Sequence, residues 1–270
     1  MRIVRFRDEQ GQVRLGRAVL GGGDRQAELL AGDLFSGPQP TGQTVAIDRL
    51  LAPLAPANIY CIGLNYREHA KESGAPLPDN PVIFMKPTTA ATHPGAPIHI
   101  PAACDPAGEV DYECELAVVI GRTARDVAQA DALGHVLGYT AANDVSARRW
   151  QRTGGGGQWI RGKSFDSFCP LGPALVTADE IPDPQSLRIK TTLNGQVMQD
   201  SSTGDMIFTV AQLIAFLSRD TTLLPGTVIL TGTPPGVGFA RKPPVWLKAG
   251  DEVVVEVEMI GALRNPVEAG

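Results

Sequence analysis

Short apolar segments, separated by glycine and proline, recur along most of the chain. Segments of this length, bounded by turn-forming residues, are typical of β-strands. They occupy residues 59–63, 82–85, 116–120, 174–176, 186–193 and 228–231. Near the C-terminus, Val253, Val255, Val257 and Met259 alternate with glutamates, which predicts a strand buried on one face. The pattern therefore predicts a mostly β (α+β) fold with few helices.

Two segments show helical spacing instead. In residues 209–219, apolar residues recur three and four positions apart, which places them on one face of a helix. Residues 65–73 are polar and are followed by Gly74, a residue favoured at helix C-termini. We expect a helix at each segment, the first amphipathic and the second short.

The beginning of the chain differs from the rest. Strand-like segments at 2–6 and 12–19 surround a turn, and a connection rich in glycine, proline and threonine follows. A stretch of alanine, proline and leucine at 51–56 suggests a boundary. We therefore expect a small N-terminal β-rich domain at residues 1–55 and a larger domain at residues 56–270.

Composition excludes several classes of protein. The 270 residues carry a formal net charge of -5, so the chain lacks the surplus cations that nucleic-acid binding needs. No apolar stretch approaches the roughly 18 residues of a membrane helix, and the first residues alternate in charge and hydrophobicity, unlike a signal peptide. We expect no nucleic-acid or membrane partner and a cytoplasmic location.

One motif is misleading. Residues 157–164 match the phosphate-binding pattern G-x-x-x-x-G-K-[ST]. That pattern binds phosphate only where a strand leads into the loop and a helix begins at the Lys-Ser pair. Here a run of glycines comes before the motif, and Pro170 prevents a long helix after it. The match therefore does not indicate nucleotide binding, although Lys163 remains of interest.

Four carboxylates alternate along one segment. In a strand, Glu109, Asp111, Glu113 and Glu115 would share a face, and the segment continues into an apolar run. One interpretation is a solvated acidic edge. The other is a partly buried site that binds a hard divalent cation such as Mg²⁺, Mn²⁺ or Ca²⁺, because its ligands would be oxygens. Asp144, which also follows an apolar stretch, is the candidate for a further ligand.

From residue 58 onward the sequence resembles the fumarylacetoacetate hydrolase family. Four segments carry the resemblance, in the same order as in the family: residues 63–72, 109–121, 143–151 and 224–238. The resemblance implies a mixed β-sandwich or roll core, preceded here by the small N-terminal β-rich appendage. It also implies a homodimer.

The resemblance assigns roles to nine residues. Carried over by position, the metal carboxylates fall on Glu113, Glu115 and Asp144, the lysine near the metal on Lys163, the substrate-binding residues on Arg148, Gln151 and Thr233, and a catalytic His-x-x-Glu pair on His69 and Glu72. On a short helix, Glu72 can accept a hydrogen bond from one imidazole nitrogen of His69 and leave the other as a base. Arg149 follows Arg148, where family members often have Asp, so either arginine is a candidate to face substrate.

The implied enzyme acts on a 2-oxo acid or β-diketo acid with Mg²⁺, or else Mn²⁺ or Ca²⁺, as cofactor. The first hypothesis is hydrolysis of a carbon–carbon bond in an acylpyruvate or fumarylpyruvate. The metal would chelate the 2-oxo acid, His69 with Glu72 would activate water, and Lys163 would stabilise the enolate. Residues 64–74 would act as a lid that orders on binding.

Two alternatives remain. The same site is suited to proton transfer alone, as an oxaloacetate keto–enol tautomerase, or to decarboxylation or dienoate isomerisation. Residues 158–173 resemble a branch of the family for which oxaloacetate tautomerase activity is implied. The non-enzymatic alternative is a β-rich binding module stabilised by a divalent cation, which leaves His69, Glu72 and Lys163 without a use.

Overall fold

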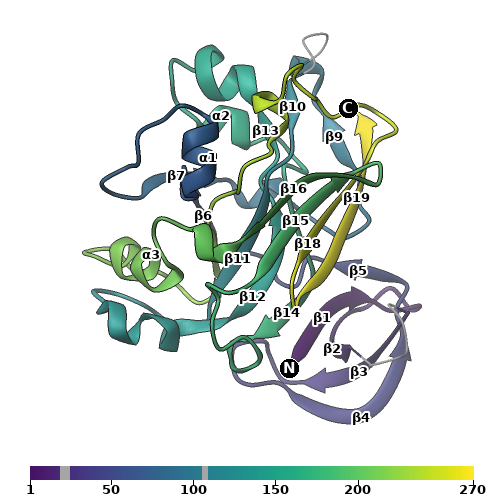
Figure 1. Ribbon diagram of the computed structural model, residues 1–270. Coiled ribbons are helices and arrows are strands. Elements are labelled where there is room, and N and C mark those ends of the chain that lie inside the picture. The colour runs from purple at the N-terminus through teal and green to yellow at the C-terminus, as the bar shows by residue number, and fades with distance from the viewer. Residues whose placement is uncertain (19–24, 105–108) are drawn as a thin grey trace.

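The apolar segments form one large sheet. The computed structural model describes residues 1–18, 25–104 and 109–270. The strands of this sheet are β1 (Arg2–Arg7), β2 (Val13–Ala18), β3 (Gln26–Ala31), β4 (Gln39–Ala46), β5 (Arg49–Leu51), β6 (Asn58–Gly63), β7 (Val82–Lys86), β8 (Ala91–Thr92), β11 (Cys114–Ile120), β12 (Val136–Asn143), β14 (Cys169–Thr177) and β17 (Thr227–Leu230). They are ordered β4-β3-β2-β1-β14-β12-β11-β17-β6-β7, with β5 beside β1 and β8 beside β14 (Figure 1).

A second sheet lies across the first. In spatial order its strands are β16 (Gln196–Ser202), β15 (Arg188–Leu193), β18 (Glu252–Val257), β19 (Gly261–Ala269) and β9 (Ile98–Ile100). In Figure 1 these strands cross in front of β11, β12 and β14. A small separate ribbon pairs β10 (Val110–Asp111) with β13 (Ser146–Ala147). The fold is therefore mostly β, as the sequence predicts, with two sheets packed face to face.

Helices are short and lie around the sheets. The α-helices are α1 (Arg67–Glu72), α2 (Ile160–Lys163) and α3 (Val210–Leu217), and η5 (Trp150–Gly154) is a π-helix. The 3₁₀ helices named in the described ranges are η2 (Thr88–Ala90), η3 (Ala102–Cys104), η4 (Gln129–His135), η6 (Ala178–Glu180), η7 (Thr203–Asp205) and η8 (Gly238–Ala240). No helix among residues 1–18, 25–104 and 109–270 is long and apolar enough to cross a membrane.

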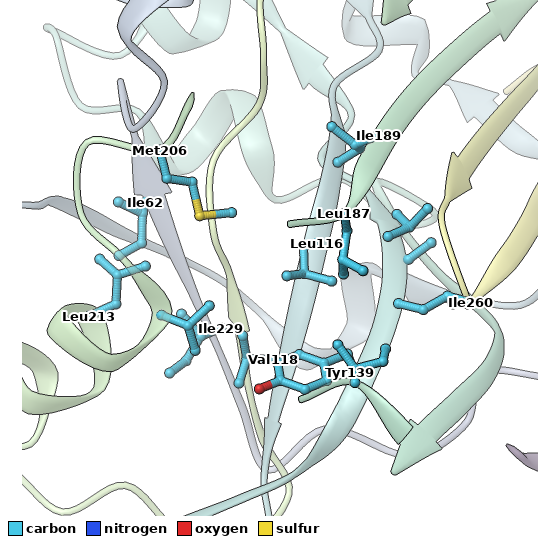
Figure 2. Packing of buried hydrophobic residues seen from close by; sticks show 14 of the residues in the cluster. Ile62, Leu116, Val118, Tyr139, Leu187, Ile189, Met206, Leu213, Ile229 and Ile260 are labelled. Carbon is cyan, nitrogen blue, oxygen red and sulfur yellow. The ribbon is translucent and has the colours of Figure 1, made fainter. Parts of the chain in front are cut away.

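Strand β11 lies between two apolar clusters. Leu116 and Val118 pack in one cluster, and Ala117 and Val119 pack in the other, since successive side chains point to opposite faces of a sheet. Figure 2 shows the first cluster, where side chains from both sheets and from α3 surround Leu116. Every residue of β11 is buried. The strand that carries Glu115 into the protein is therefore fixed on both faces.

The N-terminal strands continue the large sheet. β1 pairs with β14, with Arg2 opposite Val176, so the first residues are hydrogen-bonded to the rest of the fold. The last residue of the strand predicted at 12–19 lies outside the described residues, and β2 ends at Ala18. The division into domains at 1–55 and 56–270 stays a prediction.

The two predicted helices are confirmed, each shorter than expected. α3 begins at a capping box in which Thr209 and Gln212 exchange hydrogen bonds between side chains and backbone N–H groups. The prediction for Met259 is wrong, because β18 ends at Val257. Met259 has a positive φ of 64° and is 50% exposed in the turn before β19.

The acidic run does not form one strand, contrary to expectation. β10 ends at Asp111 and β11 begins at Cys114, so Glu113 lies in the break between them. β10 leaves the large sheet to pair with β13, while β11 pairs with β12. The carboxylates of Glu113 and Glu115 therefore lie in a different environment from that of Asp111.

Candidate metal centre and cavity

The ends of β11 and β12 bring three carboxylates together. The strands are antiparallel, with Glu115 opposite Ala142. Beyond the paired region, the Asp144 N–H donates to the Glu113 carbonyl oxygen at 2.9 Å, and the Glu113 N–H donates to the side-chain oxygen of Asn143 at 3.0 Å. These bonds fix the backbone at both ligand positions. One oxygen from each of Glu113, Glu115 and Asp144 lies within 4.8 Å of the others, and all three residues are buried.

Lys163 is buried beside this cluster. Its Nζ donates to Asp144 Oδ2 at 2.7 Å and to Glu113 Oε2 at 3.0 Å. Burial acts to lower the pKa of Lys163, but Asp144 and Glu113 outweigh it and raise the pKa, so the side chain is charged. An ammonium group carries three N–H bonds, which leaves one for the cavity that Lys163 also lines.

The carboxylates differ in their proton affinity. Burial acts to raise the pKa of Glu113, but Lys163 and Arg148 outweigh it and lower the pKa to about 2. Burial raises the pKa of Glu115 well above its usual range, and the charges of Asp144 and Glu113 raise it further. Among the described residues Glu115 makes no ion pair with a cationic side chain. No cationic side chain of the described residues therefore balances the negative charge of the Glu115 carboxylate.

This arrangement fits a hard divalent cation. All the candidate ligand atoms are oxygens. Asp144 Oδ1 lies 2.7 Å from Lys86 Nζ, yet it is buried and accepts no hydrogen bond from any described residue, because the Lys86 protons point elsewhere. They are donated to the backbone carbonyls of Val145, Lys163 and Phe168 at 2.7 to 3.0 Å. A cation at the cluster would supply the positive charge that Glu115 lacks.

A His-Glu pair approaches the cavity from α1. His69 Nδ1 lies 3.3 Å from Glu72 Oε2, as expected from the spacing of the two residues on the helix. The backbone N–H of Gly236 donates to both Glu72 oxygens, at 3.0 and 3.1 Å. Glu72 therefore holds one imidazole nitrogen, and His69 lines the same cavity as Glu113.

Arg148 faces the cavity, and Arg149 does not. The Arg148 Nε and Nη2 donate to Asp111 Oδ2 at 2.8 and 2.7 Å. Its Nη1 donates to Gln151 Oε1 at 3.0 Å and pairs with Glu113 Oε1 at 2.6 Å. Arg149 turns away and donates from Nε to Glu109 at 3.1 Å. Asp111 and Glu109 thus each neutralise an arginine rather than join the carboxylate cluster.

The cavity measures about 180 Å³, a small-molecule size. Of the predicted residues it is lined by His69, Glu113, Arg148, Gln151, Lys163 and Thr233, and apolar side chains come from Ile62, Phe84, Trp159 and Phe239. Gly63 ends β6 beneath Trp159, where a Cβ would clash with the six-membered ring of the indole. Glycine at this position therefore leaves room for the indole that forms one wall.

Three residues of the site have no signal in the sequence. Lys86, Gln199 and Phe239 come from separate segments and meet the site only through the fold. Gln199 Nε2, for example, donates to Thr233 Oγ1 at 2.8 Å. Asp111 belongs to the acidic run, but its partner Arg148 was not predictable because β10 leaves the large sheet.

Comparison with known protein families matches nearly the whole chain. The family model described as fumarylacetoacetate (FAA) hydrolase C-terminal matches residues 58–268. A second model, described as Rv2993c-like N-terminal, matches residues 1–53.

Several individual proteins are similar. The mitochondrial oxaloacetate tautomerase fahd2 of Xenopus laevis is 52% identical over 219 residues, which cover 81% of this chain and 68% of that protein. The mitochondrial oxaloacetate tautomerase FAHD2A of Homo sapiens is 49% identical over 218 residues, covering 80% and 68%. The crystal structure of 5-carboxymethyl-2-hydroxymuconate delta-isomerase from Mycobacterium smegmatis is 42% identical, covers 100% of both chains and superposes with a TM-score of 0.86.

These relatives contradict the expected location and change the order of the two hypotheses for the reaction. The expected cytoplasmic location is wrong by this comparison, because relatives at about half identity over most of the chain are mitochondrial proteins. The relatives are a tautomerase in two organisms and an isomerase, so they favour the proton-transfer alternative over carbon–carbon hydrolysis.

Proposed function

Because this chain belongs to the fumarylacetoacetate hydrolase family of enzymes, we propose that it catalyses keto–enol tautomerisation of oxaloacetate or a closely related 2-oxo acid. The observation that carries the proposal is the cluster of three buried carboxylates with Lys163 beside a cavity lined by His69. Tautomerisation needs one proton taken from carbon, one proton given to oxygen and stabilisation of the charge between these steps. The cavity contains a residue suited to each need.

We further propose that Glu113, Glu115 and Asp144 hold a divalent cation, with Mg²⁺ the first choice because every ligand is an oxygen. When bound, such a cation would act as a Lewis acid toward the adjacent oxygens of a 2-oxo acid. Mn²⁺ and Ca²⁺ accept the same ligands, so the metal ion present in the protein is a matter for measurement.

His69 is the proposed base. Glu72 binds its Nδ1, which leaves Nε2 free to take a proton from C3 of the keto acid. As that proton leaves, negative charge grows on the substrate oxygen, and the remaining N–H of Lys163 is placed to stabilise it. Transfer of that proton from the His69 imidazolium to the oxygen then gives the enol and restores neutral His69, and the reverse sequence returns the ketone. Gln151 and Thr233 line the cavity and would orient the acid.

The test follows enol-oxaloacetate by its ultraviolet absorbance with the Mg²⁺-loaded protein. We expect loss of the enol faster than in buffer, with total oxaloacetate conserved. His69→Gln should lower kcat by about a hundredfold or more, the usual worth of a positioned general base. His135→Gln is the matched control, because His135 is only half-buried, does not line the cavity, and contacts the Thr123 carbonyl through its side chain. Enol loss no faster than in buffer would contradict the proposal.

Carbon–carbon hydrolysis is the second candidate. The observation in its favour is the His69–Glu72 pair, whose geometry also suits activation of a water molecule. Product analysis separates the two reactions. Conversion of an acylpyruvate to pyruvate and a second acid would indicate hydrolysis, whereas recovery of the intact acid with faster enol loss would indicate tautomerisation.

A further inference from the structure

Arg152 stands at the cavity next to the predicted substrate-binding residues. The π-helix η5 buries Gln151 against Arg148 and leaves the next side chain, that of Arg152, on the exposed side. Arg152 nevertheless lines the cavity, and its guanidinium carbon lies 4.2 Å from the centre of the Phe239 ring. Stacking on an aromatic ring fixes the plane of a guanidinium and leaves its N–H groups pointing outward from the ring.

The second arginine of the cavity is already neutralised. Arg148 also lies over the Phe239 ring, at 4.5 Å, but its N–H groups are given to Asp111, Gln151 and Glu113. Arg152, in contrast, forms no ion pair or side-chain hydrogen bond with any residue of the described ranges. Of the two arginines that line the cavity, Arg148 is therefore balanced by carboxylates, whereas the hydrogen-bond donors of Arg152 are open to a ligand.

Both arginines contact the ring of Phe239. Asp111 accepts hydrogen bonds from the Phe239 backbone N–H at 3.0 Å and from Arg148, so a single buried carboxylate positions both the ring and the inner arginine. Because both guanidinium groups contact the same Phe239 ring, the two positive charges lie close to each other. Burial of part of its side chain, then the charge of Arg148, lower the pKa of Arg152, and a bound anion would relieve this repulsion.

We propose that Arg152 determines specificity by binding the second carboxylate of a dicarboxylic 2-oxo acid. This inference rests on the proposed function, in which the first carboxylate and the 2-oxo group are directed to the carboxylate cluster. A four-carbon dicarboxylate carries its two charges at opposite ends, so it can meet the cluster and Arg152 together across a small cavity. Arg152 offers two parallel N–H donors, the geometry that carboxylates prefer.

The first test compares two substrates that differ at one group. Oxaloacetate has a carboxylate where acetylpyruvate has an acetyl group, and both form enols that absorb in the ultraviolet. In Arg152→Gln we expect the KM for oxaloacetate to rise about tenfold, the loss of one charge-assisted contact, with the KM for acetylpyruvate within about twofold. The KM of Arg152→Lys for oxaloacetate should lie between those of the wild type and Arg152→Gln. Arg149→Gln is the control, because Arg149 pairs with Glu109 away from the cavity.

The second test measures binding without turnover. Calorimetry on the Mg²⁺-loaded protein compares malate with 2-hydroxybutanoate, which has a methyl group where malate has its second carboxylate. We expect tighter binding of malate by the wild type, and loss of that preference in Arg152→Gln. If Arg152→Gln still binds malate more tightly than 2-hydroxybutanoate, the proposed role of Arg152 is wrong, whether or not the protein tautomerises oxaloacetate. If the preference disappears but the wild type does not tautomerise oxaloacetate, the role of Arg152 stands and the proposed function fails.

Discussion

Glu115 differs from its two carboxylate neighbours in its contacts. Lys163 bridges Glu113 and Asp144, whereas Glu115 Oε2 receives the backbone N–H of Gly232 at 2.6 Å. A single neutral donor does not balance a buried negative charge, so burial and the adjacent carboxylates raise the pKa of Glu115. A proton or a metal ion must neutralise this side chain, and the two compete for it.

We predict that Glu115→Gln weakens metal binding and leaves the fold intact. Glutamine has the shape of the protonated acid, so the metal-free structure loses little, but the amide is a poor ligand for a hard cation. Calorimetry with Mn²⁺ should show affinity reduced by at least about tenfold, the scale of a disturbed metal site. Glu109→Gln, in the same acidic segment but paired with Arg149, should bind as the wild type does. Equal affinity in both variants would contradict the assignment.

Metal affinity should also depend on pH. The folded-state pKa of Glu115 is raised, so its neutral form is favoured in the metal-free protein and the metal ion must displace the proton. Affinity should therefore rise with pH below that pKa, by up to about tenfold per pH unit for one proton released. In the metal-free protein, the stability that this group contributes is lost as pH rises through the same pKa. If the metal affinity did not change between about pH 5 and pH 8, that result would contradict proton displacement at Glu115.

At the scale of elements, α3 shows how local sequence signals become structure. Its apolar face packs in the same cluster as Leu116, and its first turn is closed by the reciprocal bonds of Thr209 and Gln212. The spacing of the apolar residues predicts the helix from the sequence, whereas the cap is a finding of the structure. The helix supports the face of the sheet opposite to the second cluster.

Removal of this cap should destabilise the protein modestly. We predict that Thr209→Ala lowers the free energy of unfolding by about 1 kcal/mol, the usual value for a lost N-cap. Urea denaturation measures the change. Thr221→Ala, at an exposed position after the same helix, should change stability by less than about 0.5 kcal/mol. Equal effects of the two substitutions would mean that the cap contributes nothing.

The acidic segment shows where prediction from the sequence stops. Alternation predicts that Glu113 and Glu115 share a face, and the apolar stretch before Asp144 makes it a further candidate; the structure brings one oxygen of each within 4.8 Å of the others. The break between β10 and β11 was not predictable, because β10 finds its partner in β13, some 35 residues farther along the chain. The same holds for Arg152 and Phe239, because η5 and η8, which carry them, meet only in the folded protein.

At the scale of the whole molecule, the site depends on a strand fixed from both sides. The mostly β class followed from short apolar segments, but not the order of strands, since pairings such as β1 with β14 join distant parts of the chain. The two clusters about β11 hold its backbone and hence the carboxylates at its end. The homodimer implied by the resemblance stays a prediction.

A cavity in this core should reduce stability strongly. We predict that Leu116→Ala lowers the free energy of unfolding by about 2 to 5 kcal/mol, because Leu116 is fully buried and its surroundings relax only in part. Leu224→Ala, at a position 48% exposed, should cost much less. Thermal or chemical denaturation of both variants gives the comparison. A small loss for Leu116→Ala would show that β11 is not central to the core.

The dependence of oxaloacetate tautomerisation on the metal ion tests the central claim most directly. Enol loss is measured with three samples. They are the protein as purified, the protein from which a chelator has removed the metal ion and has then itself been removed, and that metal-free protein after Mg²⁺ is added back. We predict that catalysis disappears on metal removal and returns with Mg²⁺ in the wild type, while Glu115→Gln stays inactive throughout. Catalysis that persists unchanged in the metal-free protein would contradict the role assigned to Glu113, Glu115 and Asp144.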